Sequence, residues 1–336
     1  MSAIHPDALR LLNGFRGYQL VVAACRLGLP DRVASGPLGA GEIAAQTGTS
    51  PDAIRRMLRG LVAWGFFSED GDGRYVSTPV SDSFRSDRPG LRNMALMLSE
   101  EAYPTWGALM YSLETGKPAF EHLHGKSRWE KLAEDPEAAA QFNAAMVETS
   151  TRVARDVVAA YDFGWARSVV DVGGGSGALL AGVLRANPAL RGTLFDQPAG
   201  LAGAAEAMER VGVVERVEIV EGSFFETVPA GHDLYVLKSI VHDWDDEHAA
   251  KILAACRNAM VPSSRLLVVE RLVPEHVTTD PRDIAAVMSD LHMMVLLGGR
   301  ERTNSEFSEL FRPVGLRLAR DIEMPSDFHI VEALPV

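Results

Sequence analysis

The sequence has little cysteine and no excess of positive charge. Its two cysteines, Cys25 and Cys256, lie far apart in apolar segments with helical character. Such spacing excludes a disulfide framework and predicts buried free thiols in a reducing compartment. The formal net charge of −12 makes the molecule as a whole repel nucleic acid and anionic membranes, so we expect neither as a partner.

Long apolar runs are missing as well. No stretch approaches the roughly 18 continuous apolar residues of a membrane-spanning helix. The first apolar segment follows no basic segment and is interrupted by Asn13, Arg16 and Gln19, unlike a secretory signal. We therefore expect a cytoplasmic protein. The 336 residues, 47% hydrophobic and 23% charged, are enough for two domains with a large core.

Residues 1–90 combine short helical patterns with a turn-rich end. Apolar residues recur at helical spacing over 9–27, and residues 41–48 predict a short helix that ends in a glycine. Ser50 and Pro51 then supply an N-cap and a first helical position for a third helix, over 53–64. The turn residues 70–73 follow and predict a β-hairpin. Helix, turn, helix and hairpin form the layout of a winged helix.

The rest of the chain changes from helices to alternating strands and helices. Residues 91–165 are rich in Met, Leu, Trp and Ala at helical spacing and predict connecting helices. Residues 166–336 predict an α/β, doubly wound, Rossmann-like domain with a parallel sheet and its ligand at the carboxyl ends of the strands. A short turn before the last strand predicts an antiparallel edge. The predicted strands cover residues 168–172, 192–195, 217–220, 233–237, 265–270, 316–321 and 328–334.

Glycines follow the first of these strands in the spacing Asp171-x-Gly173-x-Gly175-x-Gly177, and Asp196 ends the second strand. Glycines let the backbone approach a ligand, and a carboxylate can accept hydrogen bonds from ribose, so a nucleoside cofactor is predicted. Dinucleotides and sulfonium nucleosides both fit such a loop. An acid inside the motif favours a cationic cofactor over a pyrophosphate. The alternative is that Asp171 only caps the next helix.

Four ordered motifs resemble those of one family, the S-adenosylmethionine-dependent small-molecule O-methyltransferases. These include the plant caffeic-acid type and bacterial antibiotic-tailoring relatives. The resemblance spans nearly the whole chain. It implies S-adenosyl-L-methionine as cofactor, a small aromatic acceptor from secondary metabolism, and a homodimer formed through an N-terminal winged-helix dimerisation domain. The motifs are residues 171–177, 195–198, 241–248 and 298–303.

The resemblance also implies the catalytic residues. It places a general base at His242 and orienting partners at Glu270 and Glu301. Transfer to an oxygen needs a base for the hydroxyl proton, and an unperturbed histidine, with a pKa of about 6.5, is largely neutral at pH 7. A metal site built from His242, Asp243 and His248 is the alternative. We expect no metal, because the first two precede the helix that carries His248.

The cofactor contacts implied by the resemblance include one departure from the family pattern. The family usually has an Asp that contacts the adenine amino group, and this chain has Ser223 there. A serine hydroxyl reaches less far, so weaker binding or an intervening water is expected. For Lys238 the alternative is a solvated surface lysine. The implied cofactor residues are Asp171, Gly173, Gly174, Gly175, Asp196, Gln197, Ser223, Phe224, Lys238, Trp244, Met146 and Ser150.

The acceptor site is less defined by sequence. Methionine side chains and aromatic rings line sites for flat aromatic molecules, although a Met-rich helix is equally well explained as core. The residues assigned to acceptor binding are Asp243, Met293, Met294, Leu297, Met110 and Trp106.

Two other functions compete with this interpretation. A DNA-binding regulator would use the helix over 53–64, but residues 1–90 hold ten arginines, no lysines and nine acids and lack the basic face that duplex binding requires. An N- or C-methyltransferase, or a non-methylating tailoring enzyme, would keep the cofactor and change the reaction. We expect the N-terminal helices to pack against a second subunit through Leu20, Val21, Leu58, Leu61 and Val62.

Overall fold

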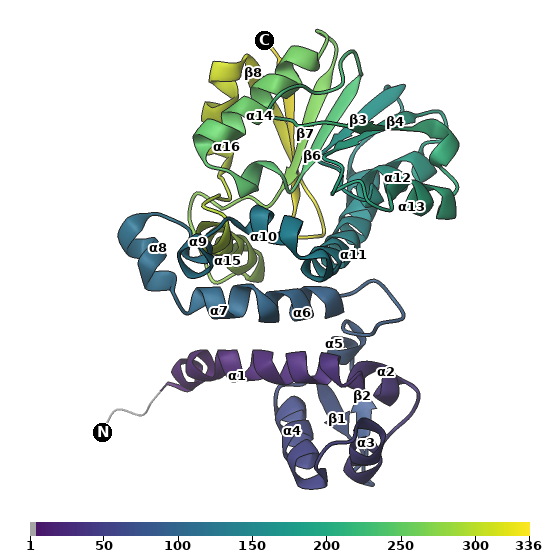
Figure 1. Ribbon diagram of the computed structural model, residues 1–336, viewed down its shortest axis with the longest axis vertical. Coiled ribbons are helices and arrows are strands. Elements are labelled where there is room, and N and C mark those ends of the chain that lie inside the picture. The colour runs from purple at the N-terminus through teal and green to yellow at the C-terminus, as the bar shows by residue number, and fades with distance from the viewer. Residues whose placement is uncertain (1–4) are drawn as a thin grey trace. The chain divides into compact units, whose positions relative to one another are not determined.

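The computed structural model describes residues 5–336, which form two compact units (Figure 1). The first unit comprises the described residues up to Pro104 together with Ala144–Thr149. The second comprises Thr105–Asn143 and Ser150–Val336. The long helix α11, Pro136–Ala160, contributes residues to both units.

The second unit is built on a mixed seven-stranded sheet in the order β5-β4-β3-β6-β7-β9-β8. The first five strands in this order are parallel, and β9 pairs antiparallel with both β7 and β8. The sheet therefore has the predicted doubly wound part and the predicted antiparallel edge. The strands are β3 Ser168–Val172, β4 Arg191–Asp196, β5 Val217–Glu221, β6 Leu234–Lys238, β7 Arg265–Glu270, β8 Leu316–Glu323 and β9 His329–Pro335.

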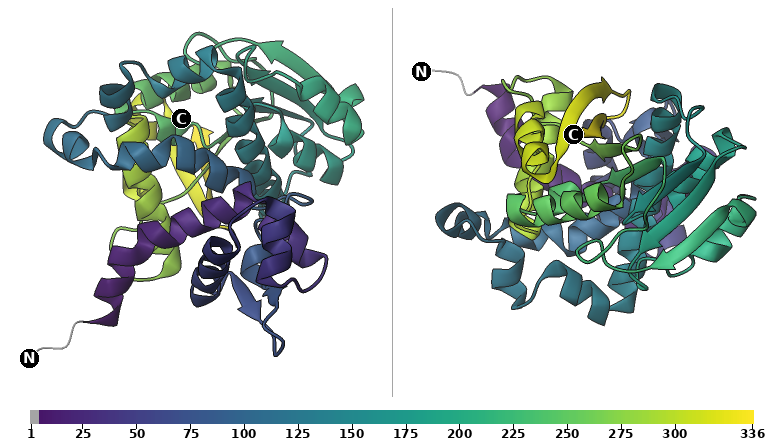
Figure 2. Two further views of the ribbon diagram at one scale, coloured as in Figure 1. Left: turned by 60° about the horizontal axis from the view of Figure 1, so that its bottom comes forward. Right: turned by 90° about the horizontal axis from the view of Figure 1, so that it is seen from above.

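Helices cover both faces of this sheet (Figures 1 and 2). Along β3, Val169 belongs to one apolar core and Val170 to the other, because successive side chains of a strand point to opposite faces. The Val169 side is covered by α12, α13 and the end of α11, and the Val170 side by α14 and α16. These helices are α12 Ala178–Ala186, α13 Ala204–Arg210, α14 Asp246–Ala259 and α16 Asn304–Phe311.

The seven strands confirm the predicted set, but the place of β9 was not predicted. The last strand lies between β7 and β8 rather than outside both. Its composition explains this position: Ile330, Val331 and Ala333 are fully buried. In β8, by contrast, Arg317 and Arg320 are exposed, as is typical of an edge strand.

Shorter helices of the second unit surround the carboxyl ends of the strands. The 3₁₀ turn η2, Val241–Asp243, follows β6, and α15, Pro281–Leu296, follows β7. The helices α8 Leu109–Thr115 and α9 Ala119–His124 pack on α15. Further along, α10 spans Arg128–Glu134.

The first unit has the predicted order of helices followed by a hairpin. Its α4 begins as expected, with the Ser50 hydroxyl accepting a hydrogen bond from the Ala53 N–H and Pro51 in the first turn. The helix α2 was not predicted. The elements are α1 Pro6–Arg26, α2 Leu29–Ala34, α3 Ala40–Thr47, α4 Pro51–Ala63, β1 Phe67–Glu69, β2 Tyr75–Ser77, α5 Pro79–Asp82, α6 Arg92–Glu100 and α7 Ala102–Trp106, which ends in the second unit.

The residues expected to face a second subunit are wrongly assigned in part. Leu58 and Leu61 are fully buried in the unit's own core, because α4 turns its apolar face toward α1 and α3. Leu20, Val21 and Val62 are partly buried against the same core. A group of four exposed apolar side chains lies instead in the first half of α1. They are Leu9, Leu11 (83% exposed), Leu12 and Phe15.

The cysteines and the apolar segments agree with the sequence analysis. Cys25 and Cys256 are free and buried, and burial raises the pKa of their thiols to about 11 and about 12. Within residues 5–336, every helix is too short or too polar to cross a membrane.

Candidate active site

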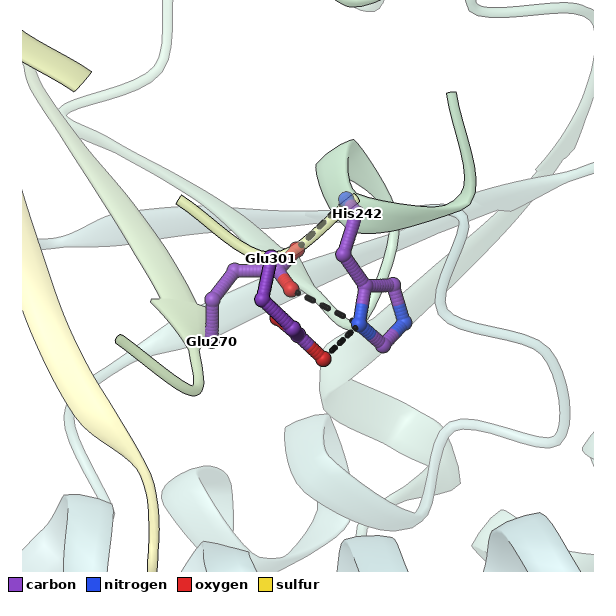
Figure 3. Close-up of side chains that lie close together, drawn as sticks. All are labelled: His242, Glu270 and Glu301. Carbon is purple, nitrogen blue, oxygen red and sulfur yellow. Dashed lines mark hydrogen bonds and ion pairs between the residues drawn. The ribbon is translucent and has the colours of Figure 1, made fainter. Parts of the chain in front are cut away.

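Three residues predicted to act together meet at the carboxyl ends of β6 and β7 (Figure 3). His242 lies in η2, Glu270 ends β7, and Glu301 follows the glycines after α15. His242 Nδ1 lies 2.8 Å from Glu301 Oε1 and 3.2 Å from Glu270 Oε2. All three side chains are buried. The structure therefore assembles the expected trio from segments up to 59 residues apart.

The contacts of His242 determine which ring nitrogen is free. An ionised carboxylate only accepts hydrogen bonds, so Nδ1 must carry the proton that it donates to Glu301. In the neutral imidazole, Nε2 then keeps its lone pair. Its nearest charged neighbour is Asp243 Oδ1 at 3.4 Å. The arrangement leaves Nε2 as the nitrogen able to take up a proton.

Glu270 also fixes the backbone turn that carries the histidine. Its Oε1 accepts hydrogen bonds from the backbone N–H groups of Ile240, Val241 and His242, at 3.0, 2.9 and 3.4 Å. A single buried carboxylate thus satisfies three donors that the end of β6 leaves free. Glu270 sets the position of His242 as well as its charge.

The glycine pair of the fourth motif allows a close approach to the same turn. A Cβ on Gly299 would lie 2.1 Å from the His242 carbonyl oxygen, so only glycine fits there. The next N–H, of Arg300, donates to that oxygen at 2.8 Å. Arg302 is fully buried and donates to the Val241 carbonyl oxygen at 3.1 Å. The motif at 298–303 therefore fixes the backbone of the turn that carries His242.

The carboxylates change the charge state expected for His242. Burial alone would lower the pKa of His242, but Glu270, Glu301 and Asp243 outweigh it and raise the pKa to about 10. In the protein without ligands the carboxylates therefore favour the protonated form of His242, whereas the sequence analysis considered an unperturbed histidine. Burial also raises the pKa of Glu270, to about 7. The pKa of Glu301 is lowered, because the histidine outweighs the effect of burial.

The same trio could geometrically hold a cation. One ligand atom from each of His242, Glu270 and Glu301 lies within 4.8 Å of the others. A metal on Nδ1 would have to displace the proton shared with Glu301. The set weighed in the sequence analysis does not form, because His248 lies on α14 and its Nδ1 contacts Asp245 Oδ1 at 2.8 Å.

The glycine loop after β3 adopts backbone conformations that favour glycine. Gly173, Gly175 and Gly177 have φ values of 72°, 55° and 77°. A Cβ on Gly173 would lie 2.5 Å from Ile240 Cδ1, whereas one on Gly175 would meet no atom within 4 Å. Gly175 thus borders open space at the carboxyl end of β3, where a ligand can approach the backbone.

Two acids lie at this loop, as predicted. Asp171 is buried, and its Oδ2 has no hydrogen-bond partner among the described residues. Burial, followed by the charge of Asp196, raises the pKa of Asp171 to about 7. Asp196 accepts hydrogen bonds from the N–H groups of Gly175 (2.8 Å) and Gln197 (2.6 Å). A buried carboxylate with one unpartnered oxygen beside an open glycine loop fits a cofactor with a positively charged group.

The structure also answers the alternative that Asp171 is only a helix cap. The N-cap position of α12 belongs to Gly177, which has no side chain to donate or accept. A backbone hydrogen bond from Leu180, in the first turn, lowers the pKa of Asp171, but this effect is smaller than that of burial. Capping therefore leaves most of the cost of burying this carboxylate unexplained.

An aromatic group lies where the adenine contacts were expected. The rings of Phe225 and Trp244 meet edge to face at 4.8 Å, and Phe224 lies 6.4 Å from Trp244. Trp244 Nε1 is enclosed and unpartnered among the described residues. Ser223 Oγ accepts a hydrogen bond from the Phe225 N–H at 3.3 Å. The hydroxyl that replaces the usual aspartate thus stabilises its own turn.

Lys238 is not the solvated surface lysine of the alternative interpretation. Its Nζ donates to Ser150 Oγ at 3.2 Å, and its side chain is partly buried. Burial lowers the pKa of Lys238 to about 8. Gln197 is exposed at the end of β4. Met146 belongs to the first unit, so its contact with the cofactor stays a prediction.

The residues assigned to the acceptor differ in burial. Met293 is buried, Met294, Leu297 and Trp106 are partly buried, and Met110 is 61% exposed. Asp243 lies directly beside His242.

The sequence analysis missed three residues around the trio of His242, Glu270 and Glu301. Ser289 Oγ donates to Glu301 Oε1 at 2.6 Å. His292 Nδ1 accepts a hydrogen bond from Trp106 Nε1 at 3.3 Å. Burial raises the pKa of Asp243 to about 6, and the buried Arg128 acts in the opposite direction. Apart from the helical spacing of Ser289 and His292 along α15, no local pattern points to them.

Comparisons with known proteins assign both parts of the chain. Residues 106–317 match the O-methyltransferase domain family, and residues 9–87 match the O-methyltransferase dimerisation domain. The second match identifies the N-terminal helices with dimerisation rather than DNA binding and indicates a homodimer. The two matches together include most of the chain.

Individual relatives cover almost the full length. The phenazine O-methyltransferase PhzM of Lysobacter antibioticus is 39% identical over 98% of this chain and 95% of its own. An N-methylating relative, the 8-amino-8-demethylriboflavin N,N-dimethyltransferase of Streptomyces davaonensis, is 35% identical over 90% of this chain and 89% of its own.

A solved structure agrees with the sequence relatives. NcsB1 is an O-methyltransferase from neocarzinostatin biosynthesis, determined in complex with S-adenosylmethionine and 2-hydroxy-5-methyl naphthoic acid. It has a TM-score of 0.82 and 33% identity, and the match covers 100% of both chains. The glycine loop, its two acids and the matches at both domains lead to one assignment. The chain belongs to the family of S-adenosylmethionine-dependent O-methyltransferases.

Proposed function

We propose that the protein methylates a hydroxyl group of a small planar aromatic acceptor from secondary metabolism, with His242 as the general base. One observation carries the proposal. Glu301 accepts the Nδ1 proton of a buried histidine, so Nε2, the nitrogen that does not face Glu270 and Glu301, is the one that can take up a proton. A base oriented through its second nitrogen is what proton abstraction from a hydroxyl requires.

In this proposal the chain's residues divide the work. S-adenosylmethionine supplies an electrophilic methyl group when bound. The open loop at Gly175, the buried Asp171 and the partly buried Lys238 hold the cofactor. His242 Nε2 takes the acceptor's hydroxyl proton as the oxygen becomes nucleophilic. The carboxylates of Glu270 and Glu301 then stabilise the imidazolium that results.

N-methylation is the second candidate, because the Streptomyces davaonensis relative is named an N,N-dimethyltransferase. An amine attacks through its own lone pair and does not need a base before transfer. The buried charged trio at His242 favours the hydroxyl, since its carboxylates specifically stabilise a histidine that has accepted a proton.

The test is a comparison of His242→Ala with His276→Ala, using labelled S-adenosylmethionine and a panel of aromatic alcohols and amines. We expect H242A to reduce O-methylation by about 10²- to 10⁴-fold and to leave S-adenosylhomocysteine binding unchanged. His276 is a matched control, because it is an exposed histidine in the loop between β7 and α15. Full O-methylation by H242A would refute the base assignment, and methylation of amines alone would favour the second candidate.

Two further assignments belong to the proposal. The exposed Leu11, Leu12 and Phe15 of α1 lie within the dimerisation domain and supply the apolar surface for a second copy. The domain boundaries near residues 90 and 165 and the cytoplasmic location remain predictions from the sequence.

A further inference from the structure

A second, partly buried histidine lies one helical turn from the residue that contacts Glu301. On α15, Ser289 contacts Glu301, and His292 follows three residues later. Residues three apart in a helix share one face, with Cβ atoms about 5–6 Å apart. His292 is therefore presented on the same side of α15 as the carboxylate that orients His242. Nothing in the proposed proton transfer uses it.

The tautomer of His292 is determined by its partner. Trp106 Nε1 can only donate, and it contacts His292 Nδ1 at 3.3 Å. Nδ1 must therefore be the unprotonated nitrogen, and Nε2 carries the hydrogen. Nε2 has no hydrogen-bond partner among residues 5–336 and is not fully enclosed by protein atoms. The second histidine thus offers one N–H donor that no described residue receives.

The charge of His292 is determined by its surroundings. Burial lowers the pKa of His292 to about 4, and the nearby cations Arg128, His242 and Arg271 act in the same direction. Glu301 is the opposing neighbour and has a smaller effect. At neutral pH the ring therefore stays uncharged, and its Nε2 can donate a hydrogen bond but cannot accept one.

We propose that His292 is an acceptor-recognition residue, whose Nε2–H donates a hydrogen bond to a ring carbonyl oxygen of the aromatic substrate. This inference rests on the proposed function and narrows its substrate class to hydroxylated aromatics that carry such an oxygen, for example hydroxyquinones. Because Trp106 blocks the other tautomer, the site disfavours an amino or hydroxyl donor at this position.

The test measures affinity rather than turnover. Calorimetry with the S-adenosylhomocysteine-loaded protein compares each hydroxy-1,4-naphthoquinone isomer with the naphthol that has the same hydroxyl position but no carbonyl groups. For the best isomer, wild type should bind the quinone about 10- to 100-fold more tightly, because an unmet buried donor is costly. His292→Leu should remove this preference. The affinity of this variant for the naphthol should stay within about twofold of the wild-type value, the margin within which independent effects add.

Two variants separate recognition from a structural role. His292→Gln keeps an N–H donor near the position of Nε2 and should retain part of the preference. Trp106→Phe removes the donor that fixes the tautomer of His292, so it should reduce the preference for the quinone. An unchanged preference in H292L, or equal weakening of quinone and naphthol, overturns the inference. If wild type binds quinone and naphthol equally well, the inference about His292 is overturned and the proposed function stands. If wild type binds no hydroxynaphthalene at all, the proposed acceptor class is refuted together with the inference.

Discussion

The carboxylates around His242 predict a specific change in the pH dependence of catalysis. In wild type, His242 Nδ1 lies 2.8 Å from Glu301 Oε1. Glu301→Gln keeps an oxygen that can accept the hydrogen bond from His242 Nδ1. The substitution removes the negative charge but preserves the shape and the orientation of the ring. Its effect on catalysis therefore isolates electrostatics from positioning.

The distance sets the size of the effect. A unit charge at 2.8 Å and an effective dielectric constant of about 20 gives an interaction of roughly 6 kcal/mol. That is an upper limit of about 4 pKa units, and an opposite charge at such distances typically shifts a pKa by about 1–3. We expect the pKa of His242 to fall from about 10 by about 2 units in E301Q.

The assay is the dependence of kcat/KM on pH. The base must be unprotonated to act, so in wild type kcat/KM should rise with pH toward the histidine pKa of about 10. In E301Q the rising limb should end about 2 pH units lower. NMR titration of the His242 ring in the ligand-free protein reports the same pKa without turnover.

The control is Glu247→Gln. Glu247 is an exposed carboxylate on α14 that pairs with Lys251, so its loss should leave the profile unchanged. If E301Q and wild type show the same limb and the same NMR titration, the carboxylate does not set the charge of His242. The electrostatic reasoning would then be refuted, even if activity fell.

Three more predictions follow from the same contacts. The pKa of Asp171 is raised to about 7, so the stability it contributes is present below its ordinary pKa of about 3.8 and is lost as pH rises through 7. Asp171→Asn should therefore raise the free energy of unfolding of the ligand-free protein at pH 8, by at most about 4 kcal/mol in denaturant unfolding. The same substitution should weaken S-adenosylhomocysteine binding in calorimetry. If the variant is no more stable than wild type, this reasoning is contradicted. Gly299→Ala should abolish activity and lower the melting temperature, because its Cβ would lie 2.1 Å from the His242 carbonyl oxygen. Gly41→Ala is the control, because a Cβ there would meet no atom within 4 Å. Dialysis against a chelator should leave methylation unchanged, since the histidine Nδ1 holds a proton shared with Glu301; loss of activity restored by a divalent ion would instead assign the trio to a metal.

Local patterns in the sequence predicted the elements well, because each depends on neighbouring residues. The cap at Ser50 and the short apolar strand that precedes Gly173 are examples. The position of β9 between β7 and β8 depends on which of the last two strands is apolar enough to be buried on both faces. That requires a comparison between two segments and not a local pattern. The shift of Leu58 from a predicted interface to the core has the same origin, since only packing reveals which face of α4 is covered.

The candidate site was predictable where a motif carried it and not elsewhere. His242, Glu270 and Glu301 were inferred from the resemblance, and the structure brings them within contact distance. The charge of the histidine depends on three carboxylates meeting at one ring, which no single motif contains. The bond between Trp106 and His292 joins residues 186 positions apart. Contacts at that separation leave no local trace in the sequence.

The distribution of charge in the site fits methylation of a hydroxyl on physical grounds. In that reaction one positive charge disappears from the cofactor, and one proton appears on the base. In the proposed site, Asp171 is the buried acid beside the glycine loop that would hold the cofactor, and Glu270 and Glu301 are the buried acids beside the proposed base His242. Lys238 interacts electrostatically with both groups, through Glu270 and Asp171. Each buried acid is costly in the protein alone. Because Glu270 and Glu301 stabilise the protonated form of His242, the second group of acids favours a reaction in which the acceptor gives up a proton.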